Sequence, residues 1–409
     1  MPKSSIAVTT VLEAGKGRGR EGLYHEIGPD TLRNKQDYCT LRGYGYRPFH
    51  KTLDKTRPAA WSTIRAIQRC FDEGFEWVFW HDADSFIMNM DHTLESIIGA
   101  PDARDFIVSA DASSGICTGS LLVRNTPWNR AFLERAYACT DLINHQWWEQ
   151  AAIIRIMEAA SPEERGKHIW VAPQQLFNSY PPMVAKTPEA GKMVPGHFIV
   201  HFTGNAPQKI ENGIHDHLEM TRFKLQSRDQ LPTALHFAGL TGEGVEVGVQ
   251  SGIFSEHILA NWPGRKLYSI DPWAAQRQTD YRDIANVSDT AHEERYGFTK
   301  ERLAHFGERS EIVRGYSVEE AQKFADNSLD FVYIDARHAY EHVLEDVQAW
   351  LPKVRLGGLL AGHDYVDRIE VNNDFGVKRA VDELLGEDNV TASTQDGPYV
   401  SWFYRKLHH

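Results

Sequence analysis

The stretch Phe75–Asn89, FEWVFWHDADSFIMN, has the greatest influence on the predicted fold of this chain. Its first six residues are mostly aromatic or β-branched, which is the composition of a buried strand. Three polar side chains, those of His81, Asp82 and Asp84, follow closely. Two carboxylates this close repel each other in a partly apolar site. A divalent cation, whose ligands a diphosphate could complete, would remove this repulsion. The stretch therefore predicts a cation site at the end of a buried strand, although a solvated turn could have the same sequence.

On both sides of this stretch, segments typical of strands and helices alternate along the first half of the chain. Such alternation indicates an α/β sheet with helices on both faces. The expected strands are residues 6–12, 46–50, 106–110, 120–123 and 198–202, and the expected helices are residues 33–42, 59–71, 128–140 and 149–159.

A second alternation follows a polar segment over residues 210–233, and no internal repeat links the two halves. Its expected strands are residues 244–249, 266–270, 311–314, 329–334 and 358–361. We therefore expect two different α/β domains, over residues 1–225 and 241–409, joined by a connector over residues 226–240.

Length and composition agree with two domains and exclude some partners. The chain has 409 residues and a net charge of -12, without a Lys/Arg tract, so nucleic acid is not an expected partner. No apolar run is long enough to span a bilayer, and no membrane span is expected. The four cysteines lack CxxC spacing, so a reduced cytoplasm is the expected location. Whether the chain forms a homo-oligomer is left open.

Several further motifs accompany the Phe75–Asn89 stretch in one order. They are NKQDYCTLRGYGYRPF (residues 34–49), RPAAWSTI (57–64), GSLLVRNTPWNRAFL (119–133), WEQAAI (148–153) and VHFTGNAPQK (200–209). Together they resemble the family of α-galactosyl-, α-mannosyl- and α-xylosyltransferases of yeast and plant cell-wall synthesis. The resemblance implies a GT-A fold that transfers a hexose or pentose, with retention, from a UDP- or GDP-sugar to a saccharide or glycoconjugate acceptor.

The resemblance also implies roles for individual residues. Asp82, Asp84 and His201 would bind the nucleotide sugar through Mn²⁺ or Mg²⁺, although His201 could instead be a hydrogen-bonded core histidine. Glu149 and Gln150 match an acidic–Gln motif near the donor sugar and acceptor, where a carboxylate could stabilise an oxocarbenium-like transition state. Both could equally be solvated residues at a helix start.

Several residues in the first half leave the donor and the diphosphate contacts open. Lys16, Arg18 and Arg20 lie in a Gly-rich loop that could bind a diphosphate or be only a flexible basic loop. Thr63 stands where the family pattern has lysine, which leaves the donor, and even activity, open. Asn205 and Pro207 replace a cysteine-containing stretch of the family, a loss that a reducing compartment would explain.

The second half contains GEGVEVGVQSGIFSEHI (residues 242–258), with glycines between a strand and a helix. Dinucleotide-binding folds share this pattern. The stretch over residues 328–365 resembles class I S-adenosylmethionine-dependent methyltransferases, especially macrocin and mycinamicin O-methyltransferases, which act on sugar hydroxyls. It implies a Rossmann-like domain that binds S-adenosylmethionine. The cofactor-binding residues would be Glu246, Gly248, Gly252 and Asp271, with Ser317 in a loop near the adenine.

The resemblance implies a catalytic set in the second half as well. His338 would be the base that an alcohol nucleophile needs, unless it is a surface histidine, while His342 is expected to be solvated. Asp335 and Asp364 match residues that bind Mg²⁺. His363 stands where those enzymes have an acid, so metal dependence is open.

The sequence thus predicts a bifunctional enzyme of polysaccharide biosynthesis that transfers a sugar and O-methylates a sugar hydroxyl. One alternative is a methyltransferase whose first half only binds carbohydrate. A second alternative is a carbohydrate-binding scaffold without enzymatic activity.

Overall fold

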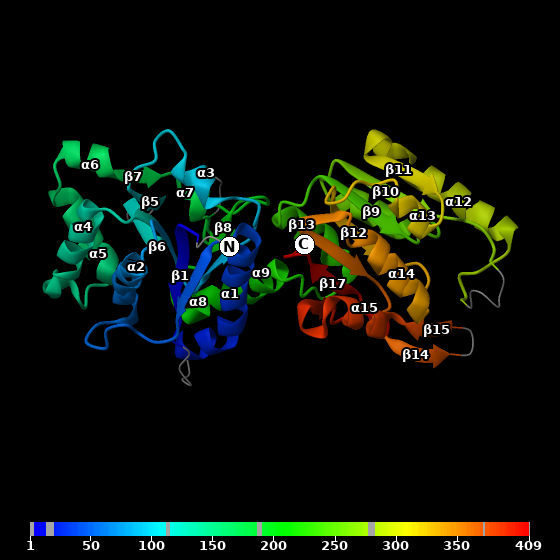
Figure 1. Cartoon of the computed structure of the whole chain (residues 1–409), viewed down its shortest axis with the longest axis horizontal. Coiled ribbons are helices and arrows are strands. Elements are labelled where there is room, and N and C mark those ends of the chain that lie inside the picture. Colours follow the sequence, from blue (N-terminus) through cyan, green and yellow to red (C-terminus); the bar gives the residue numbers. More distant parts are fainter. Residues whose placement is uncertain are drawn as a thin grey trace. The chain divides into compact units, whose positions relative to one another are not determined.

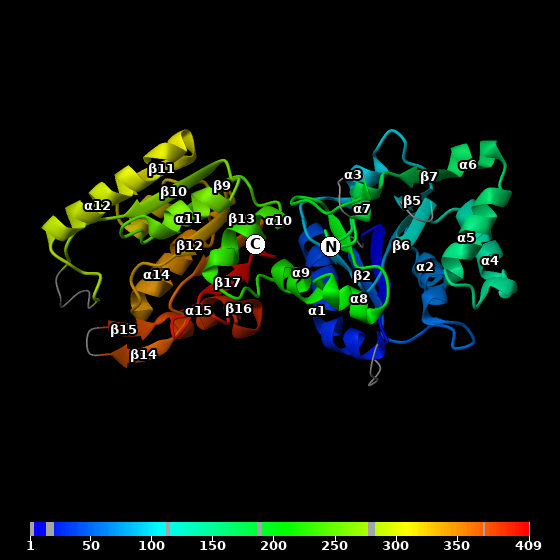
Figure 2. The same cartoon turned by 180° about the vertical axis from the view of Figure 1, so that it is seen from behind.

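The computed structural model describes residues 4–13, 20–111, 115–185, 190–276, 283–370 and 373–408. The chain forms two compact units, Met1–Thr221 and Arg222–His409. Figures 1 and 2 show the sheets and helices of each unit from opposite sides. Lys16 and Arg18 lie outside the described residues, and Arg20 is the first residue of a long helix.

The first unit is built on a six-stranded sheet with the strand order β2-β1-β3-β6-β5-β7. All neighbours pair in parallel except that β6 runs antiparallel to β3 and β5. The strands are β1 (Ile6–Val11), β2 (Gly45–Phe49), β3 (Trp77–His81), β5 (Phe106–Asp111), β6 (Gly115–Arg124) and β7 (Ile169–Ala172).

Helices cover both faces of this sheet, as the alternation predicts. Val78 and Trp80 of β3 pack on one face with α2 (Ser62–Asp72), α4 (Pro127–Tyr137) and α5 (Trp148–Ala159). Trp77 and Phe79 pack on the other face with α1 (Arg20–Arg42), α3 (Leu94–Ile98) and α7 (Gln174–Phe177). Strand β3 is therefore buried on both sides, which explains its aromatic composition.

A small second ladder extends from the end of β3. Strand β4 (Ser85–Ile87) pairs antiparallel with β8 (Ile199–His201), and Ser85 lies opposite His201. The segment 198–202, expected as the last strand of the first half, contributes β8 to this ladder. The remaining helices of the unit are η1 (Ala59–Trp61), η2 (Thr140–Leu142), α6 (Pro162–His168), α8 (Ala206–Glu211) and α9 (Ile214–Thr221).

The second unit has a seven-stranded sheet with the order β11-β10-β9-β12-β13-β17-β16. The first five strands pair in parallel. Strand β17 pairs antiparallel with β13, and β16 pairs antiparallel with β17. The order reverses between β9 and β12, where α/β sheets bind ligands at the carboxyl ends of the strands. The strands are β9 (Glu243–Val247), β10 (Lys266–Asp271), β11 (Ser310–Arg314), β12 (Leu329–Ile334), β13 (Val354–Gly362), β16 (Val390–Ala392) and β17 (Trp402–Arg405).

Helices also cover both faces of the second sheet. On one face, α13 (Ser317–Ala321), α14 (Tyr340–Trp350) and α15 (Val377–Leu385) pack against Val332 and Ile334. The alternate residues Phe331 and Tyr333 contact Trp262 and Phe254 on the other face, where α10 (Leu231–Phe237) and α11 (Ile253–Asn261) lie (Figure 2). Helices α12 (Asp289–Leu303), η5 (Ala304–Arg309) and η6 (Glu387–Asn389) and the hairpin β14 (Asp367–Glu370) and β15 (Asn373–Gly376) complete the unit.

The segment expected to be a connector, residues 226–240, lies within the second unit. It forms η4 (Arg228–Gln230) and α10, and Leu231 and Leu235 are buried. Among the described helices, none combines the length and the apolar character needed to cross a bilayer.

Candidate active sites

Helix α1 holds the loop that carries Asp82 and Asp84. The Asn34 side chain exchanges two hydrogen bonds of 2.9 Å with the backbone of Ile87, and Lys35 Nζ donates to the Ser85 carbonyl at 2.9 Å. These adjacent helix residues satisfy backbone groups of β4 that the main sheet leaves unpaired. The motif starting at residue 34 thus supports the acidic loop.

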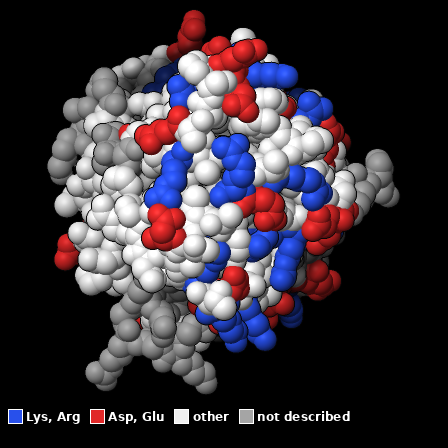
Figure 3. Space-filling view, turned by 90° about the vertical axis from the view of Figure 1, so that its left-hand side faces the viewer, with Lys and Arg blue, Asp and Glu red and all other residues white. Residues whose placement is uncertain are grey.

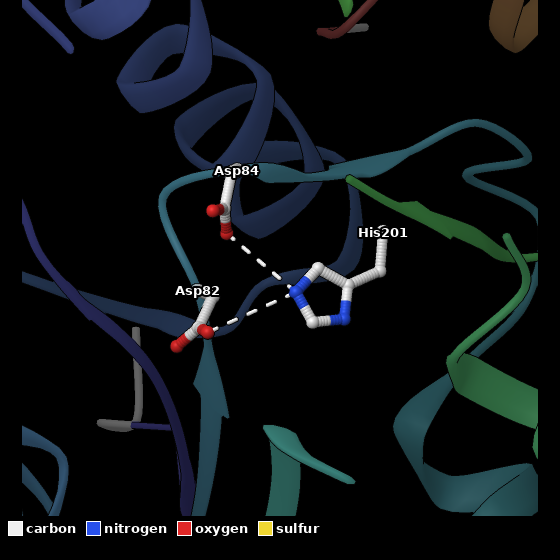
Figure 4. A group of neighbouring side chains, drawn as sticks. All are labelled: Asp82, Asp84 and His201. Carbon is white, nitrogen blue, oxygen red and sulfur yellow. Dashed lines mark ion pairs between the residues drawn. The ribbon is translucent and has the colours of Figure 1, made fainter. Parts of the chain in front are cut away.

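The acidic loop and β8 bring Asp82, Asp84 and His201 together, as Figure 4 shows. His201 Nε2 is 3.9 Å from Asp82 Oδ2 and 3.6 Å from Asp84 Oδ1. The β4–β8 pairing explains this proximity, because Ser85, next to Asp84, lies opposite His201. Two carboxylate oxygens and one imidazole nitrogen that face each other suit Mn²⁺ or Mg²⁺ with further ligands from a diphosphate.

The surroundings of His201 fit the cation site. His201 Nδ1 is 2.8 Å from Asn178 Oδ1, a contact that leaves the Nε2 lone pair free to ligate. The ring lies against Gly119, where a Cβ atom would be only 2.4 Å from His201 Cε1. Burial alone would lower the pKa of His201, but the Cys117 sulfur and the Asp84 carboxylate raise it to about 10. The two carboxylates thus favour a positive charge beside Nε2, either as a proton on this nitrogen or as a cation that replaces the proton.

Two residues without a predicted role contact the outer oxygen of Asp84. Tyr24 donates a hydrogen bond of 2.7 Å to Asp84 Oδ2, and Lys209 Nζ forms a buried ion pair with the same oxygen. Burial opposes ionisation of Asp84, but Lys209 and His201 hold its pKa well below the ordinary value. Asp84 Oδ1 still faces His201, so Lys209 leaves the cation position accessible.

Glu149 and Gln150 lie at the start of α5, next to β6. The Thr118 hydroxyl is 3.1 Å from Glu149 Oε1, and the Thr118 backbone N–H donates to Gln150 Oε1 at 3.1 Å. Glu149 is buried and is not a solvated helix-start residue. Thr118 precedes Gly119 in β6, so the chain links this pair to the strand that supports His201.

Thr63, which stands where the family pattern has lysine, is packed inside the first turn of α2. Its side chain is buried, and its hydroxyl donates to the Ala60 carbonyl at 2.9 Å.

The second unit contains a cavity of about 1220 Å³ at the carboxyl ends of its parallel strands. The volume is larger than that of a typical pocket for one small molecule. Of the predicted residues, Glu246, Gly248, Asp271, Ser317, Asp335, His338, His363 and Asp364 line it, and so does His342, which was expected to be solvated. Gly252 is instead the residue, with φ of +77°, at which α11 begins.

The loop that contains Gly248 passes close to the end of β12, where a glycine fits. Its φ is +89°, and a Cβ atom would lie 1.9 Å from the Asp335 carbonyl oxygen. Burial raises the pKa of Glu246 to about 8, although the Ser255 hydroxyl donates to its carboxyl group. A neutral Glu246 can both donate and accept hydrogen bonds in the cavity.

Asp271 and Ser317 line the cavity and form hydrogen bonds with neighbouring segments. Asp271 Oδ2 accepts from the N–H groups of Val249 (2.9 Å) and Gln250 (3.0 Å). Ser317 Oγ accepts from the indole N–H of Trp350 at 2.9 Å. Asp271 therefore shapes the glycine loop directly, a role that the sequence did not predict.

His338 is surrounded by three carboxylates. Its Nδ1 is 2.9 Å from Asp283 Oδ2, and its Nε2 is 3.0 Å from Asp364 Oδ2 and 3.7 Å from Asp335 Oδ1. Burial opposes protonation, but these carboxylates hold the pKa of His338 well above the ordinary value. Asp283 was not predicted as a site residue, because it lies outside every motif that the sequence analysis singled out.

Backbone strain accompanies both sites. Trp148, directly before Glu149, has φ of +41°, and Asp364 has φ of +55°. Such conformations cost a non-glycine residue about 1–3 kcal/mol and persist where the surrounding structure imposes them.

The first unit also has a charged cleft of about 690 Å³ between α2 and α4. Its charges are largely compensated, because Arg65 pairs with Glu134 at 3.1 Å and Arg130 with Asp72 at 2.7 Å. On the face in Figure 3, Lys and Arg side chains likewise alternate with Asp and Glu. The cleft therefore has no strong net charge for a charged ligand.

Family models match both halves of the chain. A model described as the galactosyl transferase GMA12/MNN10 family matches residues 3–105 and 99–210, which span about half of the chain. A model described as a methyltransferase domain matches residues 245–365. These matches confirm the predicted resemblances and the predicted α/β fold class.

Individual relatives match the first half. An α-1,2-galactosyltransferase of Schizosaccharomyces pombe is 24% identical over an alignment of 194 residues. The match covers 38% of this chain and 51% of that protein. A protein of Oryza sativa subsp. japonica named "Probable glycosyltransferase 6" is 26% identical over 127 residues, 29% of this chain and 26% of that protein. The chain thus spans about half of the length of the first of these curated relatives and about a quarter of the second.

Solved structures resemble each half at low identity. A glycosyltransferase involved in glycosylation of the PBCV-1 major capsid is 18% identical, with a TM-score of 0.39, over 53% of this chain and 98% of its own. The O-methyltransferase TomG from Streptomyces achromogenes is 18% identical, with a TM-score of 0.32, over 44% of this chain and 79% of its own.

Proposed function

The chain belongs to the galactosyl transferase GMA12/MNN10 family and contains a methyltransferase domain, and we propose on this basis that it is a bifunctional glycan-modifying enzyme. The first unit transfers a hexose or pentose from a UDP- or GDP-sugar to a saccharide acceptor, with retention. The second unit methylates a sugar hydroxyl with S-adenosylmethionine. The proposal depends above all on one observation: each unit holds a partly buried set of acidic and imidazole groups close together.

In the first unit, Asp82, Asp84 and His201 would hold a Mn²⁺ or Mg²⁺ ion, which would supply positive charge to neutralise the diphosphate leaving group. Lys209 fixes the outer oxygen of Asp84, so the inner oxygen stays directed at His201. Glu149, placed by Thr118, can accept hydrogen bonds from sugar hydroxyls and stabilise positive charge on the sugar ring.

In the second unit, His338 Nε2 removes the proton of the acceptor hydroxyl. The oxygen attacks the methyl carbon, the carbon–sulfur bond of the sulfonium donor breaks, and a neutral thioether leaves. Asp283 on Nδ1 fixes the tautomer and orientation of the ring. A raised pKa makes His338 a stronger base, and its neutral fraction grows with increasing pH.

The free state of the described cysteines, Cys39, Cys70, Cys117 and Cys139, is compatible with a reducing compartment, and a cytoplasmic location stays a prediction.

The donor class is tested by thermal shift with UDP- and GDP-sugars in the presence of Mn²⁺. We expect one donor at about 100 times its Kd to stabilise the chain by about 2.7 kcal/mol, because it binds only the folded state. Asp84→Ala should abolish the shift. Asp102→Ala, the same change at an exposed carboxylate, should keep it.

The absence of a shift with every donor would contradict glycosyl transfer. It would favour a methyltransferase whose first unit only binds carbohydrate. An equal shift in Asp84→Ala would contradict the proposed cation site.

A further inference from the structure

Arg228 belongs to the segment that the sequence presented as a connector, yet it lines the cavity of the second unit. Its Nη1 is 3.0 Å from Asp335 Oδ2. Its guanidinium lies 4.8 Å from the centre of the Phe254 ring. Its backbone N–H contacts the Asp396 carboxylate at 3.1 Å. Arg228 is therefore held from both ends, with its charge directed at Asp335.

Imidazole nitrogens face the other oxygens of the acidic group. Asp364 Oδ2 is 3.0 Å from His338 Nε2 and 3.2 Å from His363 Nδ1. Asp335 Oδ1 is 3.7 Å from His338 Nε2 and 4.0 Å from His363 Nδ1. The His363 backbone N–H donates to the Ile334 carbonyl at 3.0 Å, so its position follows from the β12–β13 pairing.

These surroundings do not fit Mg²⁺, which prefers oxygen ligands and keeps several of its waters. Here the two carboxylates already face two imidazoles and a guanidinium, and the charge of a guanidinium is permanent. A cation on Asp335 would have to compete with Arg228 for that carboxylate. Although ligand atoms of Asp335, His338 and Asp364 lie within 4.8 Å of one another, an imidazole paired with two carboxylates has the same spacing.

We propose that Arg228 supplies at this centre the positive charge that a Mg²⁺ ion supplies in the methyltransferases that the second half resembles, so methyl transfer here requires no divalent cation. Arg228 is a positioning residue. It neutralises Asp335 and keeps that carboxylate in place three residues before the base His338. The inference rests on the proposed methyl transfer.

The test uses the full chain with Asp82→Asn and Asp84→Asn, which remove the cation site of the first unit. Methyl transfer from labelled S-adenosylmethionine to a panel of p-nitrophenyl hexosides and pentosides is measured after EDTA treatment, with and without Mg²⁺. We expect equal rates in both conditions.

Variants separate the charge of Arg228 from a merely structural role. Arg228→Gln should lower kcat by about 100-fold through misplacement of the base, with little change in the KM for S-adenosylmethionine. Added Mg²⁺ should partly restore this rate, because Asp335 is then free to bind it. Arg228→Lys should retain more activity than Arg228→Gln. Arg265→Gln, at a side chain that is 71% exposed, is the matched control and should leave the rate unchanged.

Calorimetry with Mg²⁺ alone gives a readout that needs no acceptor. We expect no binding to the Asp82→Asn/Asp84→Asn chain and measurable binding once Arg228→Gln and His363→Glu are added. Retained binding of S-adenosylmethionine would show that each variant is folded. Mg²⁺ binding before these two changes, or a rate lost to EDTA and restored by Mg²⁺, would overturn the inference. If no glycoside is methylated by any variant, the proposed function fails, while the calorimetry still decides the role of Arg228.

Discussion

Lys35 is the most unusual buried residue of the first unit. Its side chain is inaccessible to solvent, and Nζ donates to Thr31 Oγ1 at 3.0 Å and to the Ser85 carbonyl at 2.9 Å. Burial lowers its pKa from 10.5 to about 7, although the charges of Asp84 and Asp82 oppose the shift. Between these two values, the lysine is protonated in the unfolded chain and mostly neutral in the folded one. The free energy of unfolding therefore rises with pH over this interval.

We expect Lys35→Met to flatten this dependence. In the wild type, the free energy of unfolding should gain up to about 1.4 kcal/mol per pH unit from Lys35 between pH 7 and pH 10. The variant should lack this gain because methionine has no proton to lose. Urea unfolding at pH 7, 8.5 and 10 measures the difference, with Lys167→Met, at an exposed position, as the control. Equal slopes in wild type and Lys35→Met would exclude a buried neutral amine.

At the scale of elements, the proposed cation site depends on how closely β6 approaches β8. Gly119 in β6 leaves room for the His201 ring, which the β4–β8 pairing holds in place. The same chain segment presents Thr118 to Glu149. One glycine therefore sets the distance between the ladder that carries His201 and the main sheet.

We expect Gly119→Ala to displace the His201 ring and weaken Mn²⁺ binding by about 10–100-fold, as changes around metal ligands commonly do. Calorimetry with Mn²⁺ measures this effect. In Gly166→Ala, in α6, the added Cβ meets no atom within 4 Å. That control should keep the affinity and stabilise its helix by up to about 1 kcal/mol. An unchanged affinity in Gly119→Ala would show that His201 does not bind the ion.

At the scale of the whole molecule, each compact unit has its own core and its own partly buried acidic group. Tethering two glycan-modifying units would raise the effective concentration of the first product at the second site. No residue of either acidic group comes from the other unit.

We therefore expect the two activities to be separable by mutation of the full chain. Asp82→Ala should abolish glycosyl transfer and leave methylation of an added glycoside within about twofold, since sites that share no residue and no partner act additively. His338→Ala should do the reverse, with at least about a 100-fold loss of methyl transfer. Both rates can be measured on the same preparations by donor consumption and by labelled methyl incorporation. A joint loss of both activities in either variant would contradict independent sites.

Local sequence was sufficient for much of the fold. The aromatic run of β3 and the apolar run of β12 predicted buried strands, because strands covered on both faces need apolar residues at successive positions. Helix α1 begins earlier in the chain than predicted. Its first half was not recognised as helix because it lacks a clear apolar period; this half instead supports the acidic loop. Motif order also predicted Asp82, Asp84 and His201, which the structure brings together.

The sequence by itself determined the α/β fold class and the resemblance of each half to a family. It also pointed to most of the acidic and histidine residues that the structure brings together, with Asp283 as the exception. Only the tertiary structure decided what surrounds those residues. Lys209 meets Asp84 across 125 positions of the chain, and Arg228 meets Asp335 across 107. Periodicity and motifs report interactions between neighbours in sequence, whereas the charge balance of a buried site depends on side chains that converge only when distant elements pack together.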